Sequence, residues 1–192
     1  ELVELDPAEY IAKWNEKRHS LERCEEEISQ HFKMADEVMT ISDSEVPFKM
    51  ICVNCTTIKQ TLRDKALQLA QLLLQQLATG SHAKNQYICE RYTTIQSEMK
   101  KAPANAEELD GIQKYLETTE AELQKLEEDI QQSKDVHQML RMHQYALSNE
   151  DSELFWTTFY WPVKLVEVAR QCKESIEDDR VKFMEELKST IY

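Results

Sequence analysis

Two cysteines separated by two residues, Cys52 and Cys55, form the pattern that most directly suggests chemistry. A CxxC pair supplies half of a tetrahedral zinc site or the reactive pair of a thiol oxidoreductase. A structural zinc site needs four ligands, however, and neither a second CxxC nor an HxxxH follows at zinc-finger spacing. We therefore interpret both cysteines as core thiols on a helix face. A metal-binding or redox-active bundle is the alternative, and it would require His or Cys residues that converge on this pair.

Histidine and carboxylate spacings give a second set of candidates. Glu16-x-x-His19 is one copy of the pair that di-iron bundle proteins use twice, and the sequence has no second copy. His137 and His143 lie six residues apart, so a helix would place them on different faces. Three acidic runs cover consecutive positions, as is typical of a solvated helix face, at residues 25–27, 127–129 and 177–179. These patterns predict no catalytic residue, no metal site and no cofactor.

A dense aromatic cluster lies directly before a proline in the C-terminal part of the sequence. Its members are Phe155, Trp156, Phe159, Tyr160 and Trp161, followed by Pro162. As core residues they would close the end of a helical bundle and set the angle of the final helix. As an interface they would anchor a partner, because Trp and Tyr dominate binding hot spots. The pattern favours core filling, with partner binding as the alternative.

The composition indicates which elements must position these residues. Of 192 residues, 2 are Gly and 4 are Pro, whereas sheets, barrels and nucleotide-binding loops need the turn positions that Gly supplies. No GxxxxGK[ST], GxGxxG or GxSxG motif occurs. The sequence therefore predicts an all-α protein of few, long, amphipathic helices, and no enzymatic activity in this segment.

Charge and hydropathy limit the classes of partner. The net charge of −13 argues against nucleic acid as a ligand, because phosphate binding needs clustered Lys and Arg. The longest apolar stretch, residues 67–77, is interrupted by four Gln, so the sequence predicts no membrane partner. The five scattered cysteines favour reduced thiols in the cytoplasm over a disulfide framework. The chain begins without an initiating Met or an apolar leader, which predicts an internal segment of a longer protein.

Apolar spacing and helix-ending residues predict five helices, over residues 7–41, 48–102, 105–148, 152–161 and 162–192. The second helix keeps its apolar phase through Gly80. Two helices joined at residues 79–82 are the alternative, because Gly costs a helix about 1 kcal/mol. Pro162 predicts a kink or a short break in the last helix. Residues 1–192 are thus expected to form one elongated antiparallel bundle.

Two helix starts carry clear capping signals. Asp6 precedes Pro7, which suits the first position of a helix. Asn105 precedes Glu107 and Glu108, whose charges favour the positive end of a helix dipole.

Three short stretches resemble a known family. The run FWTTFYWPVKL at residues 155–165 and the run DDRVKF at residues 178–183 look like the Trp-Pro-centred stretch of dynein heavy-chain tails. The run PANAEEL at residues 103–109 is similar to the Pro-x-x-x-Glu-Glu-Leu that starts a helix upstream of that stretch. The axonemal branch fits best, and the resemblance covers the chain from about Cys52 onward.

The resemblance implies a stem segment of a ciliary or flagellar dynein heavy chain, N-terminal to the linker and motor. Such a segment would link the cargo-anchored tail to the motor's linker in microtubule-based movement. The implied location is the cytoplasm, in the cytoskeleton of a cilium or flagellum axoneme. Implied partners are other helical bundles of the same heavy chain and dynein intermediate or light chains. The parent chain would be an ATPase motor. The alternatives are a general coiled-coil or spectrin-like scaffold and a docking platform for accessory chains.

Overall fold

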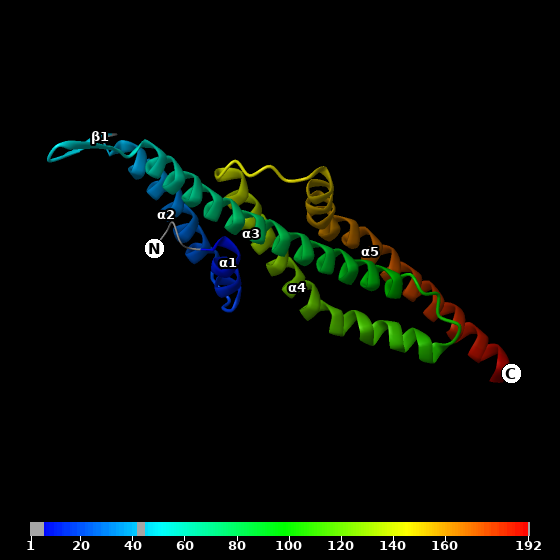
Figure 1. Ribbon diagram of the computed structural model, residues 1–192. Coiled ribbons are helices and arrows are strands. Elements are labelled where there is room, and N and C mark those ends of the chain that lie inside the picture. Colours follow the sequence, from blue (N-terminus) through cyan, green and yellow to red (C-terminus); the bar gives the residue numbers. More distant parts are fainter. Residues whose placement is uncertain (1–5, 42–44, 192) are drawn as a thin grey trace. The chain divides into compact units, whose positions relative to one another are not determined.

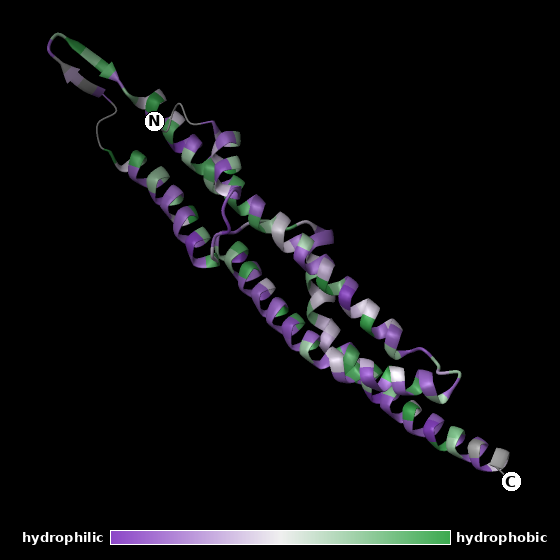
Figure 2. Ribbon diagram, turned by 90° about the horizontal axis from the view of Figure 1, so that it is seen from below, coloured by the Kyte–Doolittle hydropathy of each residue, from purple (hydrophilic) through white to green (hydrophobic). Residues whose placement is uncertain are grey.

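The computed structural model describes residues 6–41 and 45–191 of the 192-residue chain. Helices dominate this part of the chain, which confirms the all-α prediction, and a short β-hairpin interrupts them. Hydrophobic and hydrophilic residues alternate along the long helices (Figure 2), as expected of amphipathic elements. The elements, labelled where there is room in Figure 1, are α1 (Pro7–Asn15), α2 (Leu21–Thr40), β1 (Glu45–Phe48), β2 (Ile51–Asn54), α3 (Thr56–Met99), α4 (Ala106–Met142) and α5 (Asn149–Ile191).

The first predicted helix, 7–41, is two helices, so the prediction of one continuous element was wrong. The Asp6 side chain accepts a hydrogen bond from the Ala8 N–H and caps α1, as the sequence indicates. A second cap was missed, because the Ser20 hydroxyl accepts from the Arg23 N–H and starts α2. Between the two helices, His19 stacks on Trp14 at 3.8 Å between ring centroids and closes the turn.

Residues 48–54, expected at the start of the second helix, lie in an antiparallel hairpin with Glu45 opposite Asn54. The apolar residues of this stretch are spaced as they would be on a helix, which is why a helix was predicted. The β-branched Ile51 and Val53 favour extended backbone, and Lys49 takes a left-handed conformation with φ 57° at the turn. Helix α3 then begins at Thr56, whose N–H is bonded by the Asn54 side chain at 2.9 Å.

Helix α3 runs without interruption from Thr56 to Met99, so its predicted continuity through Gly80 is confirmed. Gly80 is exposed, and a Cβ atom added there would meet no atom within 4 Å. Helical hydrogen bonds and flanking apolar residues therefore hold the helix through a position where Gly alone would weaken it.

Helix α4 begins as expected but ends six residues earlier than the predicted Ser148. The Asn105 side chain accepts from the Glu108 N–H at 2.9 Å and caps its start. At its end, Gln144 takes φ 54°, the Tyr145 N–H bonds the Leu140 carbonyl and the Gln144 N–H bonds the Arg141 carbonyl. This is a Schellman cap built on glutamine in place of the usual glycine, so no glycine marks the end of α4 in the sequence.

Helix α5 contains Pro162, so the predicted division into 152–161 and 162–192 was wrong. A proline inside a helix removes one hydrogen bond and costs about 3 kcal/mol. Burial of Trp161 and Leu165 on either side of Pro162 offsets that cost, because a break would take one of them out of the core. Ser148 caps the start of α5 through a 3.0 Å hydrogen bond from the Asp151 N–H.

The chain divides into two compact units, and α3 and α4 each contribute to both. The first unit comprises Glu1–Thr79 and Met139–Tyr145. Its buried apolar residues come from α2, from the first half of α3 and from the end of α4, and include Ile28, Ala35, Leu69, Leu73, Leu74 and Leu140. The expectation that residues 1–192 form one elongated bundle stays a prediction.

The second unit comprises Gly80–Gln138 and Ala146–Tyr192 and is an up-down-up arrangement of three helices. Arg91 pairs with Glu122 and Lys84 with Asp129, so α4 runs antiparallel to α3. Its core cluster is drawn from all three helices and includes Ile88, Tyr92, Ile95, Met99, Leu126, Ile130, Trp161, Leu165, Val168 and Cys172. None of the helices in the described part of the chain has the length and apolarity to cross a membrane.

Candidate functional site

The aromatic cluster of α5 is divided between the core and the surface of the second unit. Phe155 and Trp161 are buried, with 8% and 6% of their surface exposed. Trp156 and Tyr160 are 59% and 67% exposed, and Phe159 is 39% exposed. Pro162 is half-buried. Core filling, the interpretation that the sequence favours, fits the burial of Phe155 and Trp161 and does not fit the exposure of the other three rings. The role of the cluster stays a prediction.

The buried rings attach α5 to its neighbours by parallel stacking. Trp161 stacks on Tyr92 of α3 with ring centroids 5.7 Å apart, and Phe155 stacks on His137 of α4 at 4.0 Å. Burial raises the pKa of Tyr92 to about 12, so its hydroxyl stays protonated at neutral pH. These contacts make Phe155 and Trp161 structural residues.

The exposed rings continue into a longer apolar stripe, which we call the α5 outer face and define as Trp156, Phe159, Tyr160, Val163 and Val166. Val163 and Val166 are 69% and 71% exposed, and the members recur at helical spacing. Trp156 and Phe159 contact each other edge to face at 6.2 Å. A shallow hollow of about 300 Å³ is lined by Trp156, Thr157, Tyr160, Trp161 and Lys164. Such a contiguous exposed apolar stripe is typical of an interaction site.

Two lysines lie against rings of the cluster. The Lys164 ammonium is 4.2 Å from the Trp161 ring centroid, and the Lys134 ammonium, from α4, is 4.3 Å from that of Phe159. Residues 154–166 contain one charged side chain, Lys164. Exposed Glu153 and Glu167 lie directly beyond the two ends of this stretch, in a chain whose net charge is −13.

Buried polar contacts hold α5 in register beneath this face. The Ser133 hydroxyl donates to the Asn85 side-chain oxygen at 2.6 Å. The Thr158 hydroxyl donates to the Leu154 carbonyl at 2.8 Å and lies 3.4 Å from the Asn85 carbonyl. Since an unpaired buried polar group costs about 1–3 kcal/mol, a slip of one helix against the next is penalised. The outer face is thus presented by a helix whose position is fixed.

The cysteine and histidine candidates from the sequence do not form a site. Cys52 lies exposed on β2, so its assignment to a helix core was wrong, and Cys55 is half-buried directly after that strand. His19 contacts the Trp14 carbonyl at 3.0 Å. Across residues 6–41 and 45–191, no group of three or more His, Cys, Asp or Glu residues is placed to hold a metal ion.

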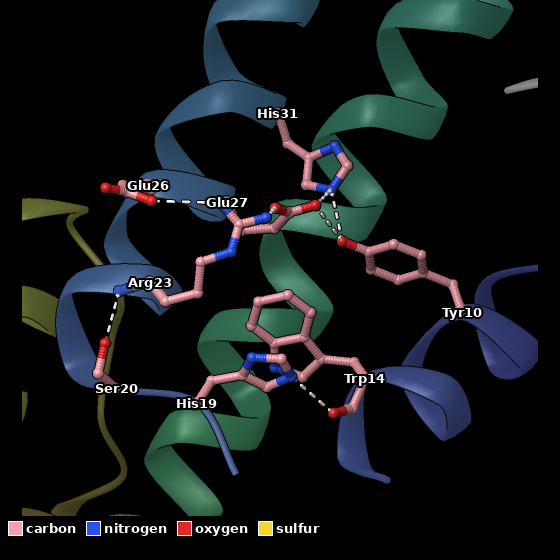
Figure 3. A network of polar contacts seen from close by, with 8 residues as sticks. All are labelled: Tyr10, Trp14, His19, Ser20, Arg23, Glu26, Glu27 and His31. Atoms are coloured by element: carbon pink, nitrogen blue, oxygen red, sulfur yellow. Dashed lines mark hydrogen bonds and ion pairs between the residues drawn. The ribbon is translucent and has the colours of Figure 1, made fainter. Parts of the chain in front are cut away.

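A polar network in the first unit was not identified from the sequence (Figure 3). The Tyr10 hydroxyl of α1 donates to the Glu27 carboxylate at 2.9 Å and lies 3.0 Å from Nε2 of His31. Because that hydroxyl has a single proton, His31 donates through Nε2. Arg23 bonds the other Glu27 oxygen at 2.7 Å. Glu27 and His31 lie 17 and 21 residues from Tyr10 in the sequence, on a different helix. Because one continuous helix was predicted here, the spacing of these residues did not indicate a contact.

Burial sets the protonation of this network. It lowers the pKa of His31, against the weaker opposing effect of Glu27. Burial, together with the hydrogen bond to Glu27, raises the pKa of Tyr10. A neutral histidine and a protonated tyrosine act here as a hydrogen-bonded clamp between α1 and α2.

Comparison with known proteins gives a consistent result. No family model matches the chain. It is 26% identical over 93% of its length to rat dynein axonemal heavy chain 12 and 29% identical over 74% to human dynein axonemal heavy chain 1. Human dynein axonemal heavy chain 12 is 26% identical over 97% of the chain. The chain spans 3–6% of the length of these curated relatives.

Proposed function

Because this chain is homologous to axonemal dynein heavy chains, we propose that it is a stem segment of such a heavy chain. Its role would be to link the cargo-anchored tail to the motor's linker in the axoneme of a cilium or flagellum. The ATPase activity would reside elsewhere in the parent chain, and this segment would transmit force without catalysing a reaction.

The observation that carries the proposal is the 44-residue helix α3, which is held in register by ion pairs and buried polar contacts to α4 and α5. A helix of this length extends about 66 Å at a rise of about 1.5 Å per residue. Hydrogen-bonded helices with interdigitated side chains resist bending and sliding, which is the physical property that a force-transmitting stem requires. The up-down-up geometry is equally suited to a general scaffold, and the homology favours a segment of a dynein heavy chain.

The stem role is tested in the full-length heavy chain by Gln71→Pro, at an exposed position in the middle of α3, with Gln71→Ala as the matched control. Proline in a helix interior removes a hydrogen bond and kinks or breaks the helix. We expect microtubule gliding velocity to fall at least two-fold while ATP hydrolysis without microtubules is unchanged. Equal velocities for the two variants would refute the stem role.

A second candidate function, a docking platform for accessory chains, is favoured by the exposure of Trp156 and Tyr160. It predicts that Trp156→Ala or Tyr160→Ala releases a bound chain from the assembled motor while the melting temperature of the protein barely changes. Retention of every chain by both variants would exclude it.

A further inference from the structure

We propose that the α5 outer face binds an acidic amphipathic helix of a partner chain. The inference deepens the docking role proposed above by naming the chemistry of the partner. It starts from the solvent exposure of Trp156, Tyr160 and Val163, each more than half exposed on one side of α5. Large aromatic rings that project from an otherwise well-packed helix are the residues that most often supply binding energy.

The spacing of these side chains favours a helical partner. Within the α5 outer face, Trp156, Tyr160 and Val163 occupy positions i, i+4 and i+7 and form a central stripe about 10 Å long at about 1.5 Å rise per residue. A second helix presents its own apolar residues at the same spacing and packs ridges into grooves against such a stripe. The hollow lined in part by Trp156, Tyr160 and Lys164 lies on one side of this stripe and has room for a large side chain of the partner.

The charge around the stripe favours an acidic partner. Helical periodicity places Phe159 and Trp161 on opposite flanks of the stripe, and each carries a lysine, Lys134 and Lys164 respectively. Within the described residues both ammonium groups lie over rings and neither forms an ion pair with a carboxylate. A partner with Glu or Asp on both sides of its apolar stripe would pair with both lysines, which is the usual arrangement of an apolar interface core and a charged rim.

The same charges disfavour a second copy of this chain on the outer face. In a two-fold dimer built on the stripe, both copies would bring the same two lysines, Lys134 and Lys164, to the contact. Beyond Val166, the stripe ends at a charged network in which Arg170 pairs with Glu167 and Glu174. The apolar contact is therefore short, and the two lysines are needed for its specificity.

The test places a photo-reactive benzoylphenylalanine at position 160 of the full-length heavy chain in its assembled motor complex. The control places the same group at Tyr87, a tyrosine of α3 that is 51% exposed and outside the stripe. We expect position 160 to cross-link to a segment of another protein with apolar residues at i, i+4 and i+7 and with Glu or Asp on both flanks. A cross-link to the same heavy chain, to a second copy of it or to a basic segment, or no cross-link above the Tyr87 control, would overturn the proposal.

A charge-reversal variant tests the electrostatic part separately. We expect Lys134→Glu combined with Lys164→Glu to lower the cross-link yield at least ten-fold, with a melting temperature within 2–3 °C of the parent, about what a change below 1 kcal/mol produces. An unchanged yield would refute the acidic partner. The stem role is tested by gliding velocity after a substitution in the first unit. The acidic partner is tested by cross-linking on α5, so either proposal can fail without the other.

Discussion

At the scale of single residues, the structure separates rings that stabilise the fold from rings that face solvent. Trp161→Ala and Phe155→Ala each remove a buried, stacked ring and are expected to lower the free energy of unfolding by about 3–5 kcal/mol. Trp156→Ala and Tyr160→Ala are expected to change it by less than about 1 kcal/mol. Urea denaturation of the four variants measures the difference. Losses of equal size in the two pairs would contradict the division of the cluster.

The division of the cluster depends on helix phase, which explains why the sequence could not make it. Residue type was enough to identify all six candidate positions. The predicted break at Pro162, however, places Phe155 and Leu165 on separate helices, so helical periodicity could not assign them to the same side. With α5 continuous, Phe155, Thr158, Trp161, Leu165 and Val168 fall on one buried side. Tertiary packing compensates for the cost of Pro162 inside the helix, and rules based on local sequence do not account for tertiary packing.

The buried His31 predicts a pH dependence of stability. Its pKa is lowered in the folded state, mainly by burial, so the unfolded chain takes up a proton near pH 6.5 before the folded chain does. The contribution of neutral His31 is therefore present above about pH 6.5 and is lost as the pH falls below it. We expect the drop in unfolding free energy between pH 7.5 and 5.5 to be smaller in His31→Gln than in the parent. Identical drops would show that His31 is not held neutral.

Gln144 occupies a backbone conformation that favours glycine. A side chain at φ 54° costs about 1–2 kcal/mol relative to the right-handed helix, and glycine avoids most of that cost while losing some entropy on folding. Gln144→Gly is expected to stabilise the protein by up to about 1 kcal/mol, and Gln144→Val to destabilise it. Thermal unfolding followed by circular dichroism compares them. The reverse order would show that the Schellman geometry is not retained in solution.

At the scale of elements, the two glycines are weak positions within otherwise continuous helices. Gly80 in α3 and Gly111 in α4 have right-handed backbone, and a Cβ atom added at either would meet no atom within 4 Å. Gly80→Ala and Gly111→Ala are each expected to raise the free energy of unfolding by about 1 kcal/mol, and together by about the sum. Denaturant titration checks both. A loss of stability in either variant would indicate that the site is more crowded than the structure shows.

The element boundaries show where sequence rules succeed and where they fail. The starts at Asp6 and Asn105 were predictable because their caps are the residue types that cap best. The start at Ser20 was hidden within a continuing apolar stripe, and the stop at Gln144 uses a residue that rarely adopts a left-handed conformation. The hairpin was missed because Ile51 and Cys55 are also spaced as one face of a helix.

At the scale of the whole molecule, the shortage of Gly and Pro was sufficient to predict the fold class, and net charge predicts a response to salt. A chain of net charge −13 is destabilised by its own repulsion, which ions screen within about 10 Å at about 0.1 M salt. We expect the melting temperature to rise when NaCl is increased from 10 to 300 mM. A fall would mean that surface ion pairs such as Arg170 with Glu167 outweigh the repulsion.

Gly80 also predicts where α3 opens first in solution. It is exposed, it lacks a side chain that would shield the neighbouring hydrogen bonds, and it stands at the boundary between the two units within α3. The helix should open there more often than around Leu69, Leu74, Ile88 and Ile95, whose side chains are buried. Amide protons just after Gly80 would then exchange with deuterated water earlier than those on either side, and Gly80→Ala would delay them. Helix α3 would thus be continuous on average and would open most often at Gly80.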